Sequence, residues 1–220
     1  MPKPRPAKFL VQDGQTIIFQ GDSLTDTDRR GAKFPFGWGY VRMAIDLITA
    51  RYPARRITYH NRGIGGNTTD DLVKRWHDDC IALRPDWVSL LIGINDLHRV
   101  FNPDSKVHVP PERYRENYEA LLERTRRETR ARLLLMDPYY ISTETDPGSQ
   151  RGTVLALLPA YVAVVREMAR RFGAIHVPLH DVFQEQLKYR PADEFGGDPV
   201  HPNPAGHMVI AEAWLKAIGW

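Results

Sequence analysis

The sequence has one cysteine, no long apolar run and almost no excess of charge, and each shortage excludes a class of protein. With Cys80 alone, the 220-residue chain forms no intrachain disulfide, which suits a reducing compartment. Its 30 basic and 27 acidic residues leave a net charge of only +3, so we expect no nucleic-acid partner. In the densest basic segment, residues 124–132, Arg is interspersed with Glu and Thr on a helical pattern, which predicts a solvated helix face.

Neither a secretory signal nor a membrane span is apparent. The basic, proline-rich residues 1–8 have no apolar stretch after them. The longest apolar run, residues 154–165, contains Pro159 and is too short to cross a bilayer, so we expect a buried helix or a subunit contact there. The sequence therefore predicts a soluble, cytoplasmic protein with no membrane partner. It also predicts one domain over residues 1–220, in which residues 1–9 are a loosely ordered arm.

Short apolar segments alternate five times with amphipathic ones. Strands are expected at residues 16–20, 57–61, 87–92, 132–136 and 174–177, and helices at residues 40–51, 69–83, 111–130, 152–172, 182–189 and 205–218. Such α/β alternation, without internal repeats, is typical of a parallel sheet between two layers of helices, a three-layer α/β/α sandwich. The order of the strands does not follow from it.

The first expected strand runs into Gly21-Asp22-Ser23. Ligands of open α/β sheets bind outside the carboxyl ends of the strands, where a serine hydroxyl would face a crevice. Ser23 is therefore the candidate nucleophile. A serine after a strand is more often only a helix cap, so the tripeptide alone is a weak signal.

Two further strand ends carry groups that suit acyl transfer. The second expected strand leads to a glycine loop ending at Gly66, which offers a backbone N–H, and the third leads to Asn95, which offers an amide. With the N–H of Ser23 they would make three donors for a developing oxyanion, and losing one such donor typically costs about 2.7–4 kcal/mol of barrier. Taken singly, each is explained more simply by a tight turn or a helix cap.

Ser23 needs a general base, and His201 stands out among eight histidines. Asp198 precedes it by three residues, with a proline after each, so that the carboxylate can hold Nδ1 while Nε2 takes the Ser23 proton. A rigid surface turn is the alternative. A metal site of Asp198, His201 and His207 is disfavoured because no second ligand cluster matches. The remaining histidines are expected to be structural: His60, His77, His98, His108, His176 and His180.

The irregular residues 24–38 begin next to Ser23 and carry Phe34, Phe36 and Trp38. These aromatic side chains either form a wall of the pocket or pack the loop down, and the sequence leaves both open. With the apolar helix expected at residues 152–172 they also suggest a homo-oligomer, although core packing explains that helix equally well.

Four blocks in order along the chain resemble the SGNH hydrolases, also called the GDSL esterase and lipase family. They are Gly21-Asp22-Ser23-Leu24-Thr25, residues 61–68, Gly93-Ile94-Asn95-Asp96 and Asp198-Pro199-Val200-His201-Pro202. The Gly-x-Ser-x-Gly elbow of the ordinary α/β-hydrolases is absent, and Gly63 stands where some family members carry Ser.

The resemblance implies a flavodoxin-like fold with a five-stranded parallel sheet of order 2-1-3-4-5 and no cofactor or metal. It implies that Ser23 is the nucleophile, that Gly66 and Asn95 complete an oxyanion hole, and that Asp198 orients His201. Within the family, residues 37–41, 84–89, 91–96 and 201–208 resemble intracellular bacterial acetylxylan esterases.

We therefore expect a serine carboxyl-ester hydrolase that removes acetyl groups from xylo-oligosaccharides or related acetylated saccharides. A lysophospholipase or thioesterase for longer acyl chains, or a broad short-chain esterase, is the alternative among enzymes. A catalytically silent carbohydrate-binding module is the alternative of another class, and it would use Trp38, Tyr40, Tyr139 and Tyr140.

Overall fold

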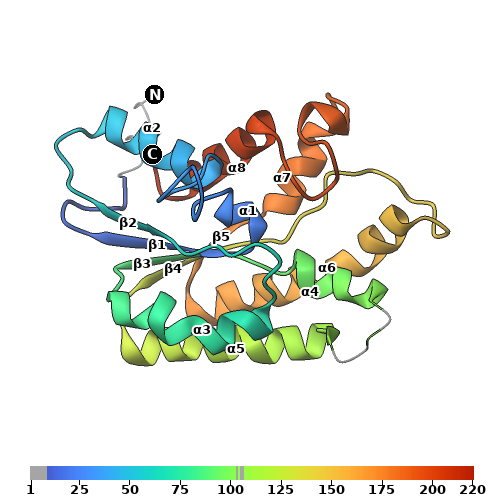
Figure 1. The fold of residues 1–220 in the computed structure, drawn as a ribbon, viewed down its shortest axis with the longest axis horizontal. Coiled ribbons are helices and arrows are strands. Elements are labelled where there is room, and N and C mark those ends of the chain that lie inside the picture. The colour runs from blue at the N-terminus through green and yellow to red at the C-terminus, as the bar shows by residue number, and fades with distance from the viewer. Residues whose placement is uncertain (1–8, 103, 105–106) are drawn as a thin grey trace, which may run out of the picture.

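A five-stranded parallel sheet forms the centre of the molecule. The computed structural model describes residues 9–102, 104 and 107–220. The strands are β1 (Thr16–Gly21), β2 (Thr58–Asn61), β3 (Trp87–Leu91), β4 (Arg132–Met136) and β5 (Ile175–Val177), and their order is β2-β1-β3-β4-β5 (Figure 1). The predicted fold class and strand order are confirmed.

Helices cover both faces of the sheet. They are α1 (Ser23–Asp26), α2 (Tyr40–Arg51), α3 (Thr69–Asp79), α4 (Ile94–His98), α5 (Pro111–Glu128), α6 (Gln150–Phe172), α7 (Leu179–Gln186) and α8 (Pro204–Ala217). In Figure 1, α1, α2, α7 and α8 lie above the sheet, and α3, α4, α5 and α6 lie below it. The parallel strands are joined through these helices, so the carboxyl ends of all five strands lie at one edge of the sheet.

Two helices differ from their expected bounds by three residues or more, and α5, α6 and α8 differ by one or two. The helix expected at residues 182–189 begins earlier, at Leu179, because Pro178 takes the capping position, where its missing N–H costs nothing. The helix expected at residues 69–83 ends at Asp79, and a separate 3₁₀ turn follows at Ile81–Leu83. Helix α4 was not expected as a helix, because five residues are too few for a periodic pattern.

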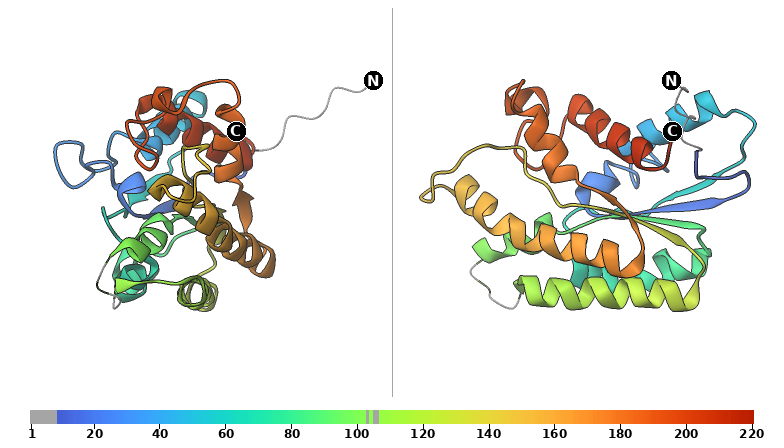
Figure 2. Two further views of the ribbon diagram at one scale, coloured as in Figure 1. Left: turned by 90° about the vertical axis from the view of Figure 1, so that its right-hand side faces the viewer. Right: turned by 180° about the vertical axis from the view of Figure 1, so that it is seen from behind.

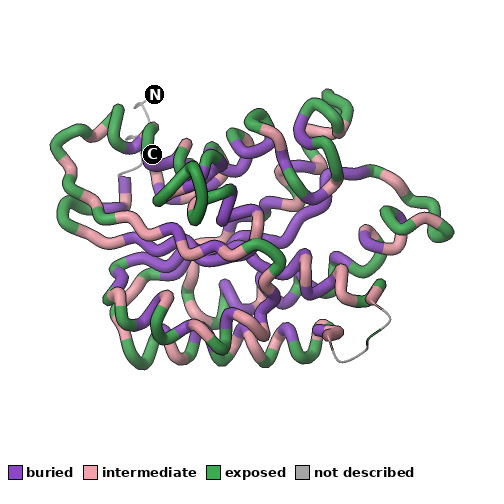
Figure 3. Tube along the Cα trace, in the orientation of Figure 1, coloured by how far each residue is buried: buried purple, intermediate pink, exposed green. Residues whose placement is uncertain are grey.

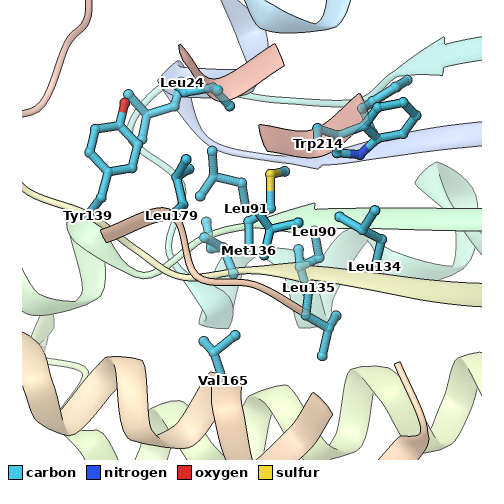
Figure 4. Close-up of a cluster of buried hydrophobic side chains, with 14 of the residues drawn as sticks. Leu24, Leu90, Leu91, Leu134, Leu135, Met136, Tyr139, Val165, Leu179 and Trp214 are labelled. Carbon is cyan, nitrogen blue, oxygen red and sulfur yellow. The ribbon is translucent and has the colours of Figure 1, made fainter. Parts of the chain in front are cut away.

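The core lies on both sides of β3, all of whose residues are buried. Figure 4 shows Leu90 and Leu91 between Val165 of α6 on one side and Trp214 of α8 on the other. The indole N–H of Trp214 donates to Ser89 Oγ at 2.9 Å, which satisfies its polar atom inside the core. Figure 3 shows that burial follows the sheet and the inner sides of the helices.

Helix α6 is longer than the apolar run of residues 154–165 indicates. By length and composition it is, among the described residues, the one helix that could cross a membrane, with a mean hydropathy of 1.4 in its most apolar window. Half of that window is buried, and the helix packs against β4, β5 and α5. The core helix of a globular fold has these same properties.

The loosely ordered arm expected at residues 1–9 lies outside the described residues except for Phe9. For Phe9 the prediction was wrong: its ring is buried and stacks on Tyr52, with the ring centroids 4.6 Å apart. The next residue, Leu10, donates its N–H to the carbonyl of Ile218, so this segment is fixed beside the C-terminus (Figure 1).

Candidate active site

Ser23 lies directly after β1, at the first position of α1. A side chain at Gly21 would place its Cβ 2.3 Å from the carbonyl oxygen of Leu91, so only glycine lets the two strands approach here. The carboxylate of Asp22 accepts a hydrogen bond from the N–H of Leu24 at 3.0 Å and caps the helix. No described residue accepts the backbone N–H of Ser23, which leaves that donor free.

The structure brings the predicted serine, histidine and aspartate together. Ser23 Oγ lies 3.1 Å from His201 Nε2, and His201 Nδ1 lies 3.0 Å from Asp198 Oδ2. The other carboxylate oxygen of Asp198 accepts the N–H groups of Val200 and His201 at 2.7 and 2.8 Å. This is the geometry of a nucleophile, a base and a group that orients the base.

Hydrogen bonds favour the ionised form of Asp198. Partial burial raises the pKa of this carboxyl. Hydrogen bonds from the N–H groups of His201 and Val200 and from the His201 ring lower the pKa by a larger amount, so the net pKa is below the ordinary value. Asp198 therefore carries a negative charge at neutral pH and can stabilise an imidazolium at His201.

The loop that carries Asp198 and His201 is fixed to the chain after β4. The N–H of Ile141 donates to the Pro199 carbonyl at 2.8 Å, and the hydroxyl of Tyr139 donates to the Val200 carbonyl at 3.2 Å. The side chains of Asp198 and His201 nevertheless remain 52% and 58% exposed. The site is thus open to solvent and gives access to a bulky substrate.

Gly66 and Asn95 lie in the segments after β2 and β3, the two strands that flank the strand leading to Ser23. The amide nitrogen of Asn95 donates to the Asn67 carbonyl at 3.0 Å and to Asp22 Oδ2 at 3.3 Å. Asn67 follows Gly66 and Asp22 precedes Ser23, so Asn95 joins the two loops that carry the other predicted donors. The N–H of Gly66, like that of Ser23, has no acceptor among the described residues.

Two buried carboxyl groups lie next to these donors. Burial raises the pKa of Asp22 to about 7; the N–H of Leu24 opposes the rise and the charge of Asp96 adds to it. Burial also raises the pKa of Asp96 to about 6, although hydrogen bonds from the side chain and N–H of Thr69 lower it. Asp22 therefore holds a proton much of the time near neutral pH.

Sequence reasoning missed Arg75 on α3, which binds the chain at the ends of β1 and β2 and in the glycine loop. Its guanidinium donates to Asn67 Oδ1 at 2.8 Å, to the Arg62 carbonyl at 2.8 Å and to the Gly21 carbonyl at 3.2 Å. It also pairs with Asp79 at 2.8 Å. In the sequence this residue looks like any arginine on the surface of an amphipathic helix, and no local pattern distinguishes it.

Asn61 was likewise not recognised as a positioning residue. Its amide nitrogen donates to the carbonyls of Thr25 and Phe36 at 2.6 and 2.8 Å, and its side-chain oxygen accepts the N–H of Gly63 at 3.0 Å. A Cβ at Gly63 would lie 2.4 Å from the backbone nitrogen of Asp26, so a serine here requires helix α1 to shift.

The aromatic residues suggested for a sugar-binding module are mostly unavailable. Tyr40 and Tyr139 are fully buried and Tyr140 is 4% exposed, so they cannot present a ring face to a ligand. Trp38 is partly exposed and packs edge-on against His207. Phe34 projects into solvent, so the loop neither packs down completely nor forms a closed wall.

The disfavoured metal site does not assemble. His207 lies on α8, where its Nδ1 accepts the backbone N–H of Tyr40 at 3.2 Å, and burial lowers its pKa to about 4. The described residues contain no group of three or more His, Cys, Asp or Glu side chains placed to hold a metal ion.

Known proteins share this sequence pattern. Residues 19–209 match the GDSL-like Lipase/Acylhydrolase family. The chain is 37% identical over 220 residues to an acetylxylan esterase of Geobacillus stearothermophilus, and the match covers 96% of each protein. It is 26% identical over 228 residues to the uncharacterized protein YpmR of Bacillus subtilis (strain 168), a match that covers 98% of this chain and 86% of that protein.

Solved structures share the fold over nearly the whole chain. A crystal structure of an acetylxylan esterase from Geobacillus stearothermophilus has a TM-score of 0.86 at 36% identity, covering 96% of this chain and 97% of that one. An alpha/beta hydrolase enzyme from the metagenome of Lake Arreo, Spain, has a TM-score of 0.87 at 33% identity, covering 96% and 98%.

The variant Asp22→Asn tests whether this buried carboxyl holds a proton near neutral pH. In the unfolded chain an aspartate has a pKa of about 3.9, so at about pH 6 the folded protein binds a proton that the unfolded chain has released. The resulting stability is lost as the pH rises through about 7, the pKa in the folded state. We expect the free energy of unfolding of the wild type, minus that of the variant, to fall by about 1 kcal/mol between about pH 6 and about pH 8.

Urea denaturation at several pH values measures this difference. Both proteins share every other titrating group, so the subtraction removes the contributions of groups that do not interact with Asp22, such as His207. A difference that stays constant across this pH range would contradict the raised pKa of Asp22.

Proposed function

The chain belongs to the GDSL-like lipase/acylhydrolase family and is a carboxylic ester hydrolase, and from this premise we propose that it deacetylates xylo-oligosaccharides or related sugars through an acetyl-enzyme on Ser23. The observation that carries the proposal is the contact of 3.1 Å between Ser23 Oγ and His201 Nε2, with Asp198 behind the ring. The acetyl specificity rests on the 37% identity to an acetylxylan esterase.

In the proposed first half-reaction, Ser23 Oγ attacks the acetyl carbonyl carbon while His201 Nε2 takes the hydroxyl proton. Asp198 stabilises the imidazolium through Nδ1–H. When the tetrahedral intermediate collapses, the bond to the sugar oxygen breaks, and His201 gives its proton to that oxygen. Water then attacks the acetyl-enzyme with His201 again as base, and acetate leaves as Ser23 regains its proton.

In this proposal the oxyanion accepts from three donors: the free N–H groups of Ser23 and Gly66 and the amide of Asn95. The two hydrogens of that amide already serve Asn67 and Asp22, so donation to the oxyanion exchanges one of these bonds. The bond of 3.3 Å to Asp22 is the longer one and the easier to give up. The raised pKa of Asp22 favours this exchange, because a neutral carboxyl does not repel a nearby oxyanion.

A homo-oligomer and a cytoplasmic location stay predictions. The irregular residues 24–38 support the homo-oligomer, since Phe34 is 77% exposed on a single chain. The single cysteine supports the second, since Cys80 is buried and free.

The variant Ser23→Ala tests the assignment of the nucleophile. It removes the attacking oxygen and leaves the donors in place, so we expect release of acetate from acetylated xylo-oligosaccharides to fall by about 10³-fold or more. Melting temperature should change little, because within the described residues the Ser23 hydroxyl makes its one hydrogen bond to the exposed imidazole of His201. Labelling by a fluorophosphonate should be lost together with activity.

Ser149→Ala is a matched control, because it also removes one serine hydroxyl, at the cap of α6. This control should keep both labelling and turnover. Substantial acetate release by Ser23→Ala, with the control active, would refute Ser23 as the nucleophile.

Acyl-chain length tests the acetyl specificity. The surroundings of Ser23 include polar groups and glycine: the Asn95 amide contacts Asp22, and a Cβ at Gly65 would lie 3.8 Å from Ser23 Cβ. A long chain would gain little there from burial, which is worth about 0.8 kcal/mol per CH₂ where it occurs. We expect kcat/KM for p-nitrophenyl acetate to exceed that for the octanoate by about tenfold or more. A preference for octanoate would favour the lysophospholipase or thioesterase alternative.

A further inference from the structure

A second concave site lies at the amino-terminal edge of the sheet, opposite the edge that carries Ser23. Its cavity has a volume of about 670 Å³. The ends of α5 and α6 and the starts of β4 and β5 form it. The lining side chains that carry charge are all arginines: Arg126, Arg130, Arg132, Arg170 and Arg171.

Topology explains why these arginines converge. Both α5 and α6 return antiparallel to the strands, so they end at the same side of the molecule (Figure 2). Cations in the last turn of a helix are stabilised by the helix dipole, which accounts for Arg126 of α5 and for Arg170 and Arg171 of α6. Arg130 and Arg132 follow the end of α5, and the dipole does not account for them.

Most of this positive charge is not neutralised by the protein. Arg171 pairs with Glu119 and lies 3.9 Å from Glu167. Among the described residues, no carboxylate makes an ion pair with the other four lining arginines, and Arg132 stacks on the ring of Trp87 at 4.2 Å. A chain with a net charge of +3 thus gathers four unpaired guanidinium groups in one cavity.

The positive surface continues beyond this cavity. A neighbouring hollow of about 490 Å³ shares Arg126, Arg171 and Phe172 and adds Arg127 and a single acidic residue, Glu123. Arg127 itself pairs with Glu128. The unpaired arginines therefore belong to the first cavity, which is the centre of the positive charge.

We propose that this cavity binds a small molecule with two or more linked phosphoryl groups. The planar guanidinium fork matches two phosphate oxygens at once, and all cations here are arginines, with no lysine. Small-molecule sites typically have volumes of about 300–1,000 Å³, and this cavity lies within that range. Linked phosphates supply several negative charges within the reach of arginines that come from two helix ends and a turn.

Calorimetric titration with inorganic tripolyphosphate and with ATP, at about 0.15 M salt, tests the proposal. The wild type should bind both with similar affinity, because the phosphates are the part recognised. The variant Arg130→Gln/Arg170→Gln should bind both about tenfold more weakly or worse, since each lost guanidinium removes a charge-assisted hydrogen bond. Both side chains are exposed and make no ion pair, so esterase activity should stay as in the wild type, and melting temperature without ligand should fall by about 4 °C at most, because Arg170 lies in the last turn of α6.

The matched control is Arg42→Gln/Arg190→Gln, which removes the same charge from exposed positions outside the cavity. This control should keep the affinity of the wild type within about twofold. Equal weakening in both double variants would overturn the proposal, because it would show that the anion responds only to the net positive charge of the protein. Absence of binding to the wild type would also overturn it. So would tighter binding of a short single-stranded oligonucleotide or of anionic vesicles than of tripolyphosphate, because the surface would then bind a macromolecule or a membrane.

Discussion

His201 reaches Ser23 because the loop that carries it is fixed to the chain after β4. The two residues are 178 positions apart, and ordering so long a connection costs entropy that local contacts must offset. The bonds from Ile141 to Pro199 and from Tyr139 to Val200 supply part of that compensation. A second part comes from Asp198 itself, whose Oδ1 binds two backbone N–H groups of its own loop, so that the carboxylate and the ring move as one unit.

The segments that follow β1, β2 and β3 form the side of the site opposite the His201 loop. Because β1 lies between β2 and β3, the three loops after these strands are neighbours, and they carry Ser23, Gly66 and Asn95. Arg75 then binds the ends of two of these loops from the side of α3. The proposed nucleophile and the proposed donors are thus held by backbone that cannot shift without breaking several hydrogen bonds, as preorganised electrostatic stabilisation of an oxyanion would require.

Local patterns predicted the elements well, because each needs only its own residues. The strand at β4 and the helix at Tyr40–Arg51 have the expected bounds. Strand order came from the resemblance of the motifs, since alternation alone does not contain it. Arg75 and Asn61 were beyond sequence reasoning, because their partners lie in other loops. The burial of Asp22, and hence its pKa near 7, depends on the packing of β1 and α1, which the tripeptide does not reveal.

The same topology gives the two edges of the sheet different electrostatics. At the carboxyl edge, the backbone N–H groups of Ser23 and Gly66 have no acceptor among the described residues, and we propose that they bind an oxyanion. At the amino edge, the C-termini of α5 and α6 come together, and the carbonyl dipoles there favour cations. Four of the five arginines there have no carboxylate partner among the described residues, and two of these four, Arg130 and Arg132, lie beyond the end of α5, where the helix dipoles do not account for them. Residues 124–132 alone predict only an exposed helix face, because two of the five arginines of the cavity, Arg170 and Arg171, come from a distant helix.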